Sequence, residues 1–404
     1  MNIERFGGRR GLHLILIGGM LTAWACMDEG PGGVEGGEPI DAALAKDMLR
    51  SVVDNAIAPS YADFASLAEA LESASADWAD AVGTEAEVEA HAVAAEAWRA
   101  AIGAWQRAEL MQLGRAANSS AVAGENLRDE IYSWPTVNSC LVDAELVAGE
   151  FGNDDFVSTH LVNVYGLDTL EYLLFHPGEG NACPPQHPIN ADGDWEALGA
   201  EAVSERRARY AAAIASALSN TADELEADWA GSYADWLAEP DAGDSPYQDV
   251  PTALDELMRA IFYLDTQVKD AKIAEPGGIT CNASCLDKLE SKWANASAEH
   301  VAANLAGFRL VFLGGDDAAS GVGFDDLLSS IGEDQLADEM IAAIDDAIVV
   351  FDGLSGDFSE ILAEDERGLD DAHAAIKRIT DLLKGDFATL LSLTIPGEAA
   401  GDAD

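Results

Sequence analysis

The sequence has 404 residues and carries 74 acidic residues against 22 lysine and arginine residues, a formal net charge of -52. This excess of negative charge argues against a nucleic-acid partner, because phosphate backbones are bound by basic surfaces. Hydrophobic residues make up 49% of the chain, enough for a real core, so a disordered acidic protein is also disfavoured. The acidic charge has two possible interpretations: a solvated surface that favours solubility, or an electrostatic field that concentrates cations.

Residues 1–25 have the pattern of a secretory signal peptide. Arg5, Arg9 and Arg10 precede an uncharged apolar run that is too short for a convincing membrane span. Cys26 follows the small residue Ala25 and resembles the lipid-acceptor cysteine of a bacterial lipoprotein. Ordinary cleavage without lipidation remains open, but both readings predict export, to the periplasm or as an outer-membrane lipoprotein with a lipid anchor at Cys26.

Residues 26–39 are rich in Gly and Glu and predict a flexible tether between the anchor and the folded part. Four further cysteines then remain in an oxidising compartment, where disulfides are the expected use. We favour the pairs Cys140–Cys183 and Cys281–Cys285, because each pair stays within one half of the chain. A zinc site built from all four cysteines is the alternative, although two close Cys pairs are missing.

Apolar residues recur three and four positions apart along almost the whole remaining chain, and no segment alternates as a strand would. The pattern predicts an all-α fold of two helical-bundle halves, 40–238 and 247–396, separated by the Pro- and Gly-containing segment 239–246. The expected helices span 40–55, 60–82, 85–113, 122–131, 156–175, 194–229, 251–272, 283–313, 322–329, 333–352 and 358–392.

Several expected helices place a carboxylate inside the apolar stripe. Glu109 follows Trp98 and Trp105 at helical spacing, and Asp168 lies on the stripe of its own helix. Glu171 is three residues beyond Asp168, so the two carboxylates could converge on one cation. In the second half of the chain, Asp265 lies on an apolar face and Glu290 lies beside an apolar stripe.

A buried carboxylate must be hydrogen-bonded, protonated, paired with a cation or bound to metal. The ordinary explanation is either a hydrogen bond at a helix end or a basic partner such as Arg99, Arg107, Arg115 or Arg259. With only 22 basic residues, the chain has few cations to neutralise clustered carboxylates, and this shortage favours a metal ion.

The run from Tyr165 to Phe175 resembles a motif of imelysin-like proteins, Gly-x-His-x-x-Glu followed by Tyr-Leu-Leu-Phe. Gly166 and Glu171 match this motif, and Asp168 stands where the family usually has histidine. Further segments agree with the family in their order along the chain: 57–61, 97–109, 132–135, 272–277 and 290–297. The resemblance as a whole extends over approximately 40–396.

The resemblance implies two helical halves with a site near their interface, in exported proteins linked to iron uptake or regulation. It identifies Asp168 and Glu171 with the metal-binding pair of the family, for a metal ion or a metal-bearing ligand. We add Glu109 and Glu290 as further ligands or as acceptors beside them. Replacing imidazole by carboxylate shifts the preference toward hard ions such as ferric iron, calcium or manganese. Partners would be other iron-uptake proteins of the cell envelope.

Enzyme activity is poorly supported, although some family members have been described as metallopeptidases. The sequence has no His-Glu-x-x-His motif, and its seven histidines are not paired at ligand spacing. His160 and His176 could approach Asp168, but a surface or capping role is the simpler expectation for both. The alternative to metal binding is a non-catalytic interaction module of the cell envelope.

Overall fold

The computed structural model describes residues 40–280, 283–397 and 399. The expected signal peptide, the tether with Cys26, and Cys281 lie outside the described residues, so what the sequence predicts for them stays a prediction. Within the described ranges every regular element is an α-, 3-10 or π-helix, with no strand. The predicted all-α fold is therefore confirmed.

The helices up to residue 238 are short and irregular in the middle of this region and long at either end. They are α1 (Ala42–Val52), η1 (Val53–Ile57), α2 (Ala58–Ala81), α3 (Glu87–Ala108), η2 (Gly114–Ala116), α4 (Leu127–Ile131), α5 (Ser139–Ala148), η3 (Glu150–Gly152), α6 (Phe156–Thr159), η4 (Val162–Val164), α7 (Leu167–Phe175), α8 (Pro188–Ala191), α9 (Asp194–Trp229) and α10 (Ser232–Ala238).

The remaining helices begin after the segment 239–246. They are α11 (Val250–Ile261), η5 (Leu264–Ala274), η6 (Leu286–Lys288), α12 (Ser297–Leu313), α13 (Phe324–Ser330), α14 (Asp334–Asp352), α15 (Phe358–Glu364), α16 (Asp370–Leu382), η7 (Leu383–Phe387) and α17 (Ala388–Leu390). The proposed division of the chain at 239–246 stays a prediction.

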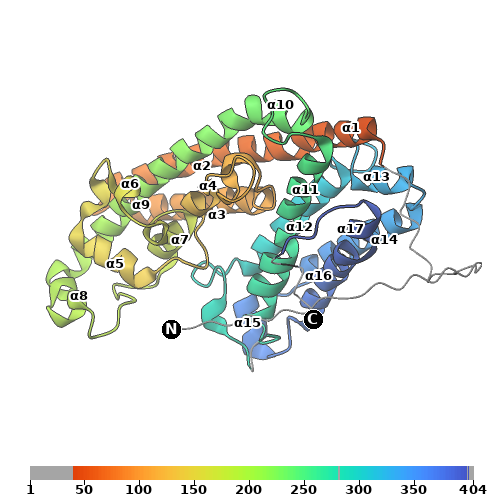
Figure 1. The fold of residues 1–404 in the computed structure, drawn as a ribbon. Coiled ribbons are helices and arrows are strands. Elements are labelled where there is room, and N and C mark those ends of the chain that lie inside the picture. The colour runs from red at the N-terminus through yellow and green to blue at the C-terminus, as the bar shows by residue number, and fades with distance from the viewer. Residues whose placement is uncertain (1–39, 281–282, 398, 400–404) are drawn as a thin grey trace, which may run out of the picture. The chain divides into compact units, whose positions relative to one another are not determined.

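The long helices α3 and α9 both pack along α2, and the three supply much of the core (Figure 1). Aromatic side chains fill the space between them: the Tyr61 and Trp229 rings have centroids 6.0 Å apart, and those of Phe64 and Trp105 lie 5.1 Å apart. These four side chains are fully buried. Their burial explains the regular apolar spacing on α2 and α3, because removing large apolar surfaces from water is the main driving force for folding.

Helix α12 packs closely against α3, and Gly307 makes this approach possible. A Cβ atom at this position would lie 2.0 Å from the carbonyl oxygen of Arg107, which is inside van der Waals contact. The same face of α12 also carries Asn304, which donates from Nδ2 to the carbonyl oxygen of Gln106 at 2.6 Å. The two helices are thereby fixed at the level where α3 ends.

Several predicted helices differ from the observed ones. Residues 42–81 form one continuous helical run where two helices were expected, and a π-helical turn, η1, precedes Pro59 in this run. The expected helix 156–175 is broken by extended backbone before Gly166, and the expected helix 283–313 begins only at Ser297. Helices α5, α8 and α10 were not predicted. No helix in the described ranges is both long and apolar enough to cross a membrane.

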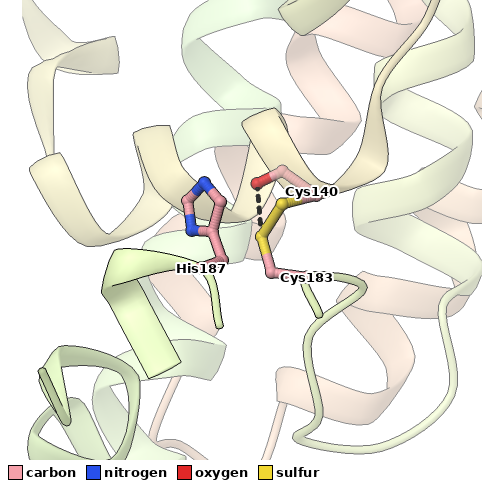
Figure 2. Close-up of side chains that lie close together, drawn as sticks. All are labelled: Cys140, Cys183 and His187. Atoms are coloured by element: carbon pink, nitrogen blue, oxygen red, sulfur yellow. Dashed lines mark hydrogen bonds between the residues drawn. A yellow bond between two sulfur atoms is a disulfide. The ribbon is translucent and has the colours of Figure 1, made fainter. Parts of the chain in front are cut away.

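The predicted disulfide between Cys140 and Cys183 is confirmed (Figure 2). It joins the first turn of α5 to the loop before α8, and the His187 ring lies beside it. Oxidised sulfurs offer no thiolate ligands, so the alternative of a zinc site built from all four cysteines is wrong. Because Cys281 is outside the described residues, the pair Cys281–Cys285 stays a prediction.

Candidate metal centre

Helix α7 holds both carboxylates of the predicted pair. Gly166 precedes it with φ of 93°, a left-handed value that favours glycine, and an added Cβ would lie 2.9 Å from the carbonyl oxygen of Ile131. Asp168 lies in the first helical turn and Glu171 one turn later. Residues 167–174 are all buried, as expected for a helix that is apolar on most sides. Both carboxylates therefore lie in the interior, at 2% and 3% exposure.

Asp168 is hydrogen-bonded by uncharged groups. Its Oδ2 accepts from the Ser133 hydroxyl at 2.8 Å, and its Oδ1 accepts from the backbone N–H of Thr169 at 3.1 Å. Ser133 belongs to the turn that contains the cis peptide bond between Trp134 and Pro135. Burial raises the pKa of Asp168 from 3.8 to about 7, against the smaller opposing effects of these hydrogen bonds and of the Arg128 charge.

Glu171 is held by the segment that leads into α12. Its Oε1 accepts from the Ser291 hydroxyl at 3.1 Å and from the backbone N–H groups of Trp293 and Ala294 at 2.8 and 2.9 Å. Burial raises its pKa from 4.5 to about 6, although these donors and His300 oppose the change. The contacts connect α7 to the second half of the chain.

Asp168 and Glu171 line one cavity of about 260 Å³ together with Glu290 and Trp134. Two lysines also border this cavity. Lys288 pairs with Glu275 at 3.1 Å, and the Nζ of Lys292 lies 5.4 Å from the centre of the Trp293 ring. Among the described residues, no basic side chain forms an ion pair within 4.0 Å of Asp168 or Glu171.

Glu109 lies at the C-terminal end of α3, where the helix dipole disfavours a negative charge. Two cations compensate for this position. Arg128 donates from Nε and Nη2 to Oε1 at 3.2 and 3.0 Å, and the Lys272 ammonium donates to Oε2 at 3.1 Å. Both oxygens of Glu109 are therefore engaged by charged protein groups.

Lys272, on η5, is the centre of a buried polar network. Its ammonium group lies 2.8 Å from Glu290 Oε1 and also donates to Gln106 Oε1 at 2.6 Å and to Asn304 Oδ1 at 3.0 Å. Burial by itself would lower the pKa of Lys272, but the carboxylates of Glu109 and Glu290 raise it above its usual value. The lysine is thus a permanent buried cation between two carboxylates.

Glu290 Oε1 accepts two further hydrogen bonds, from the Tyr132 hydroxyl at 2.9 Å and from Gln106 Nε2 at 3.1 Å. Its Oε2 lies 3.3 Å from His300 Nδ1. Burial opposes the charged form, but Lys272 and His300 more than offset it and lower the pKa of Glu290 to about 2. Glu290 is consequently ionised at neutral pH, with Lys272 as its counter-ion.

The family model described as Peptidase_M75: Imelysin matches residues 57–385, which is most of the chain. The protein belongs to the imelysin family. This confirms the resemblance that was based on the motif around Asp168 and Glu171.

Solved structures agree in fold. An imelysin-like protein from Psychrobacter arcticum 273-4 has a TM-score of 0.66 at 18% identity and covers 89% of this chain and 99% of its own. A candidate iron-regulated protein A precursor from Parabacteroides distasonis ATCC 8503 has the same TM-score at 19% identity, with 88% and 96% coverage. A comparison with curated proteins finds no match.

The four predicted site residues of this imelysin are all buried but fall into two pairs. Asp168 and Glu171 share a helix and a cavity and have uncharged partners, whereas Glu109 and Glu290 are joined through Lys272. Glu290 belongs to both groups, since it pairs with Lys272 and also lines the cavity of Asp168 and Glu171. Glu109 and Glu290 thus act as acceptors within the protein's own charge network.

The donors around Asp168 and Glu171 are compatible with a hard cation. The atoms that could ligate a metal are carboxylate and hydroxyl oxygens, the ligand type of calcium, manganese and ferric iron. Among the described residues, no hydrogen-bond donor contacts Glu171 Oε2. Two other groups of the described residues bring three side chains of metal-ligating type within 4.8 Å of one another, and neither contains these carboxylates. One of the two is formed by His187 and the disulfide-bonded Cys140 and Cys183, which offer no thiolate. Any third ligand would therefore have to come from a hydroxyl, a backbone carbonyl or water.

Sequence reasoning missed Lys272 as the partner of Glu109 and Glu290. A signal existed: Asp265, Val268 and Lys272 follow one another at steps of three and four and extend the apolar stripe of α11. The same register places Asp265 inward, where it pairs with Lys384 Nζ at 3.0 Å and with Lys269 Nζ at 3.5 Å. The expectation of a basic partner is thus confirmed for Glu109, Glu290 and Asp265. The partners are Arg128 and lysines, and not the four arginines named as candidates.

The two histidines considered near Asp168 have other surroundings. His160 Nε2 lies 3.5 Å from Glu145 and 3.9 Å from Glu150. His176 packs against the Trp293 ring at 4.8 Å, and burial together with the Arg207 charge lowers its pKa to about 4. His176 therefore stays neutral above this pH.

Proposed function

We propose that this imelysin is an exported lipoprotein that binds one hard metal ion at Asp168 and Glu171 and serves in iron uptake or homeostasis. Iron is the ion we favour, and calcium or manganese would suit the same oxygen donors. The metal would be held by the two carboxylates, with Glu290 at the edge of the same cavity. Its partners would be other iron-uptake proteins of the cell envelope.

One contrast supports this proposal: two buried carboxylates have basic partners and two do not. Glu109 and Glu290 surround Lys272, while the hydrogen bonds to Asp168 and Glu171 come from hydroxyl and backbone donors. An ionised carboxylate without a counter-ion is expensive to bury, so Asp168 and Glu171 must either take up protons or bind a cation. A bound cation would favour the charged form of both.

Export and the iron connection are supported by other observations. The first 26 residues have the pattern of a lipoprotein signal. One structural neighbour is described as a candidate iron-regulated protein A precursor. The acidic surface charge would concentrate cations near the protein in addition to keeping it in solution.

The test is calorimetric titration of the chelator-stripped protein with ferric citrate, Ca²⁺, Mn²⁺ and Zn²⁺. We expect one ion to bind at a single site and the variant Asp168→Asn/Glu171→Gln to lose at least about tenfold in affinity, since even supporting groups of metal sites contribute that much. These substitutions keep acceptor oxygens for Ser133 and Ser291. Affinity should also fall as the pH drops from 7 to 5, because protons compete for both carboxylates.

The matched control is Glu69→Gln/Glu85→Gln, which removes two exposed carboxylates and the same amount of charge. If this control and the site variant both bind the ion as tightly as the unmodified protein, the assignment to Asp168 and Glu171 is wrong. Weak binding of every divalent ion in all three proteins would reflect the net charge only. The protein would then be better described as a non-catalytic interaction module of the cell envelope.

A further inference from the structure

A second group of metal-ligating side chains lies outside the cavity around Asp168. Glu145 is in the last turn of α5, Glu150 begins η3, and His160 directly follows α6. One ligand atom from each of the three lies within 4.8 Å of the other two. Gly149, with φ of 74°, ends α5 and reverses the chain so that Glu150 comes back beside Glu145.

The surroundings fix which nitrogen of His160 faces the carboxylates. Nδ1 lies 2.9 Å from the carbonyl oxygen of Phe156, which can only accept, so Nδ1 carries the proton. The Thr159 hydroxyl, 3.2 Å from Nδ1, donates its own proton to the carbonyl oxygen of Asp155 and so is also an acceptor here. In the neutral ring, Nε2 therefore presents a lone pair toward Glu145 and Glu150.

Three acceptors then converge with no donor between them. Nε2 of His160 lies 3.5 Å from Glu145 Oε2 and 3.9 Å from Glu150 Oε2. Among the described residues, His160 is the only basic group within 4.0 Å of either carboxylate. Arg206 is close to Gly149, but its Nη1 donates to the carbonyl oxygens of Leu146 and Val147. A cation at the centre would satisfy all three acceptors.

The spacing suits a transition metal. Ligand atoms at about 2.0–2.1 Å from a tetrahedral zinc ion lie about 3.3 Å from one another. The observed separations of 3.5 and 3.9 Å exceed this value by about 0.2 and 0.6 Å, and the larger gap is to Glu150, whose exposed side chain can move closer. A carbonyl that accepts from the second ring nitrogen is also the usual support of a metal-binding histidine.

We propose that Glu145, Glu150 and His160 form a second metal site, for a first-row divalent ion such as Zn²⁺. The imidazole nitrogen distinguishes this site from the all-oxygen pair of Asp168 and Glu171, since nitrogen ligands favour zinc and its neighbours over calcium. Three protein ligands leave further coordination positions for water. The alternative is a charged His160 that forms ordinary ion pairs with both glutamates.

The experiment uses the protein with Asp168→Asn/Glu171→Gln as background, so that its result does not depend on the first site. Calorimetric titration with Zn²⁺ should detect one site in this background. His160→Asn keeps a side-chain donor for the Phe156 carbonyl but removes Nε2, and Glu145→Gln removes one carboxylate. Each should lower the Zn²⁺ affinity by at least about tenfold. Glu85→Gln, the charge-matched control, should leave it unchanged.

A second measurement uses the unmodified protein, so that its result does not depend on whether the variants fold. Co²⁺ added to that protein should broaden the NMR signals of the His160 ring and produce the visible absorption of a nitrogen-ligated cobalt ion. Zn²⁺ affinity that is the same in the background and in its His160→Asn derivative would overturn the proposal. His160 signals that stay sharp at saturating Co²⁺ would overturn it equally.

Discussion

Asp168 couples the stability of the metal-free protein to pH. Its pKa is about 7 in the folded state against 3.8 as the reference value, so the folded protein holds this proton more tightly than the unfolded chain. Its contribution to the free energy of unfolding is fully present below about pH 4 and is lost as the pH rises toward 7. At 1.36 kcal/mol for each pKa unit, the loss is about 4 kcal/mol at most.

We therefore expect Asp168→Asn to flatten the pH dependence. Asparagine cannot ionise, so the variant should gain stability relative to the unmodified protein between pH 4 and 8, by up to about 4 kcal/mol. Urea unfolding with a chelator present measures this difference at each pH. Glu85→Gln, at an exposed position, should show a profile parallel to that of the unmodified protein. A parallel profile for Asp168→Asn would mean that Asp168 is already ionised near its usual pKa.

At the scale of elements, Lys272 holds together segments that are distant in sequence. Its ammonium group connects η5 to the end of α3, to the segment before α12 and to α12 itself. Every partner is buried, and the two carboxylates depend on this one cation together with Arg128. Removing the lysine would leave Glu290 in the interior with no basic residue but His300 beside it among the described residues.

Lys272→Met should consequently destabilise the protein by about 3–5 kcal/mol, the usual cost of removing one partner of a buried ion pair. Chemical denaturation at pH 7 measures the change. Lys377→Met is the matched control, because Lys377 pairs with the exposed Asp381 on the surface of α16 and should contribute less than about 1 kcal/mol. Equal effects of the two substitutions would show that the network around Lys272 contributes no more than a surface pair.

The sequence predicted helices well where their limits are local, and poorly where tertiary contacts set them. Helix α9 matches its predicted range, 194–229. The segment Glu290–Asn295 has a composition typical of a helix, but it forms turns. The N–H groups of Trp293 and Ala294 donate to Glu171, more than a hundred residues earlier, and this contact fixes the turns. No local pattern carries that information.

The candidate site divides in the same way. Helical spacing was sufficient to predict that Glu109 and Asp168 are buried, since it depends only on neighbouring residues. Glu290 is buried as well, but its segment forms turns, so helical spacing does not explain its position. Which carboxylate has a cation beside it depends on where η5 packs, and Lys272 lies 163 residues from Glu109. From the shortage of basic residues we expected clustered carboxylates without a basic partner. Asp168 and Glu171 agree with this expectation among the described residues, whereas Glu109 and Glu290 share Lys272.

For the whole molecule, the net charge of -52 predicts that salt stabilises the folded state. Like charges repel more strongly in the compact protein than in the expanded chain. Salt shortens the range of this repulsion, from about 10 Å at 0.1 M to about 3 Å at 1 M. The surface ion pairs are weakened by the same screening, but each contributes little.

We expect the melting temperature to rise steadily between 0.05 and about 1 M NaCl, and KCl to give the same rise. The variant Asp168→Asn/Glu171→Gln should show the same slope, because screening acts on the whole surface and not on one cavity. A hard ion held by Asp168 and Glu171 should instead raise the melting temperature at micromolar concentration only when both carboxylates are present. A melting temperature that falls with NaCl would mean that the surface ion pairs outweigh the repulsion among the 74 acidic residues.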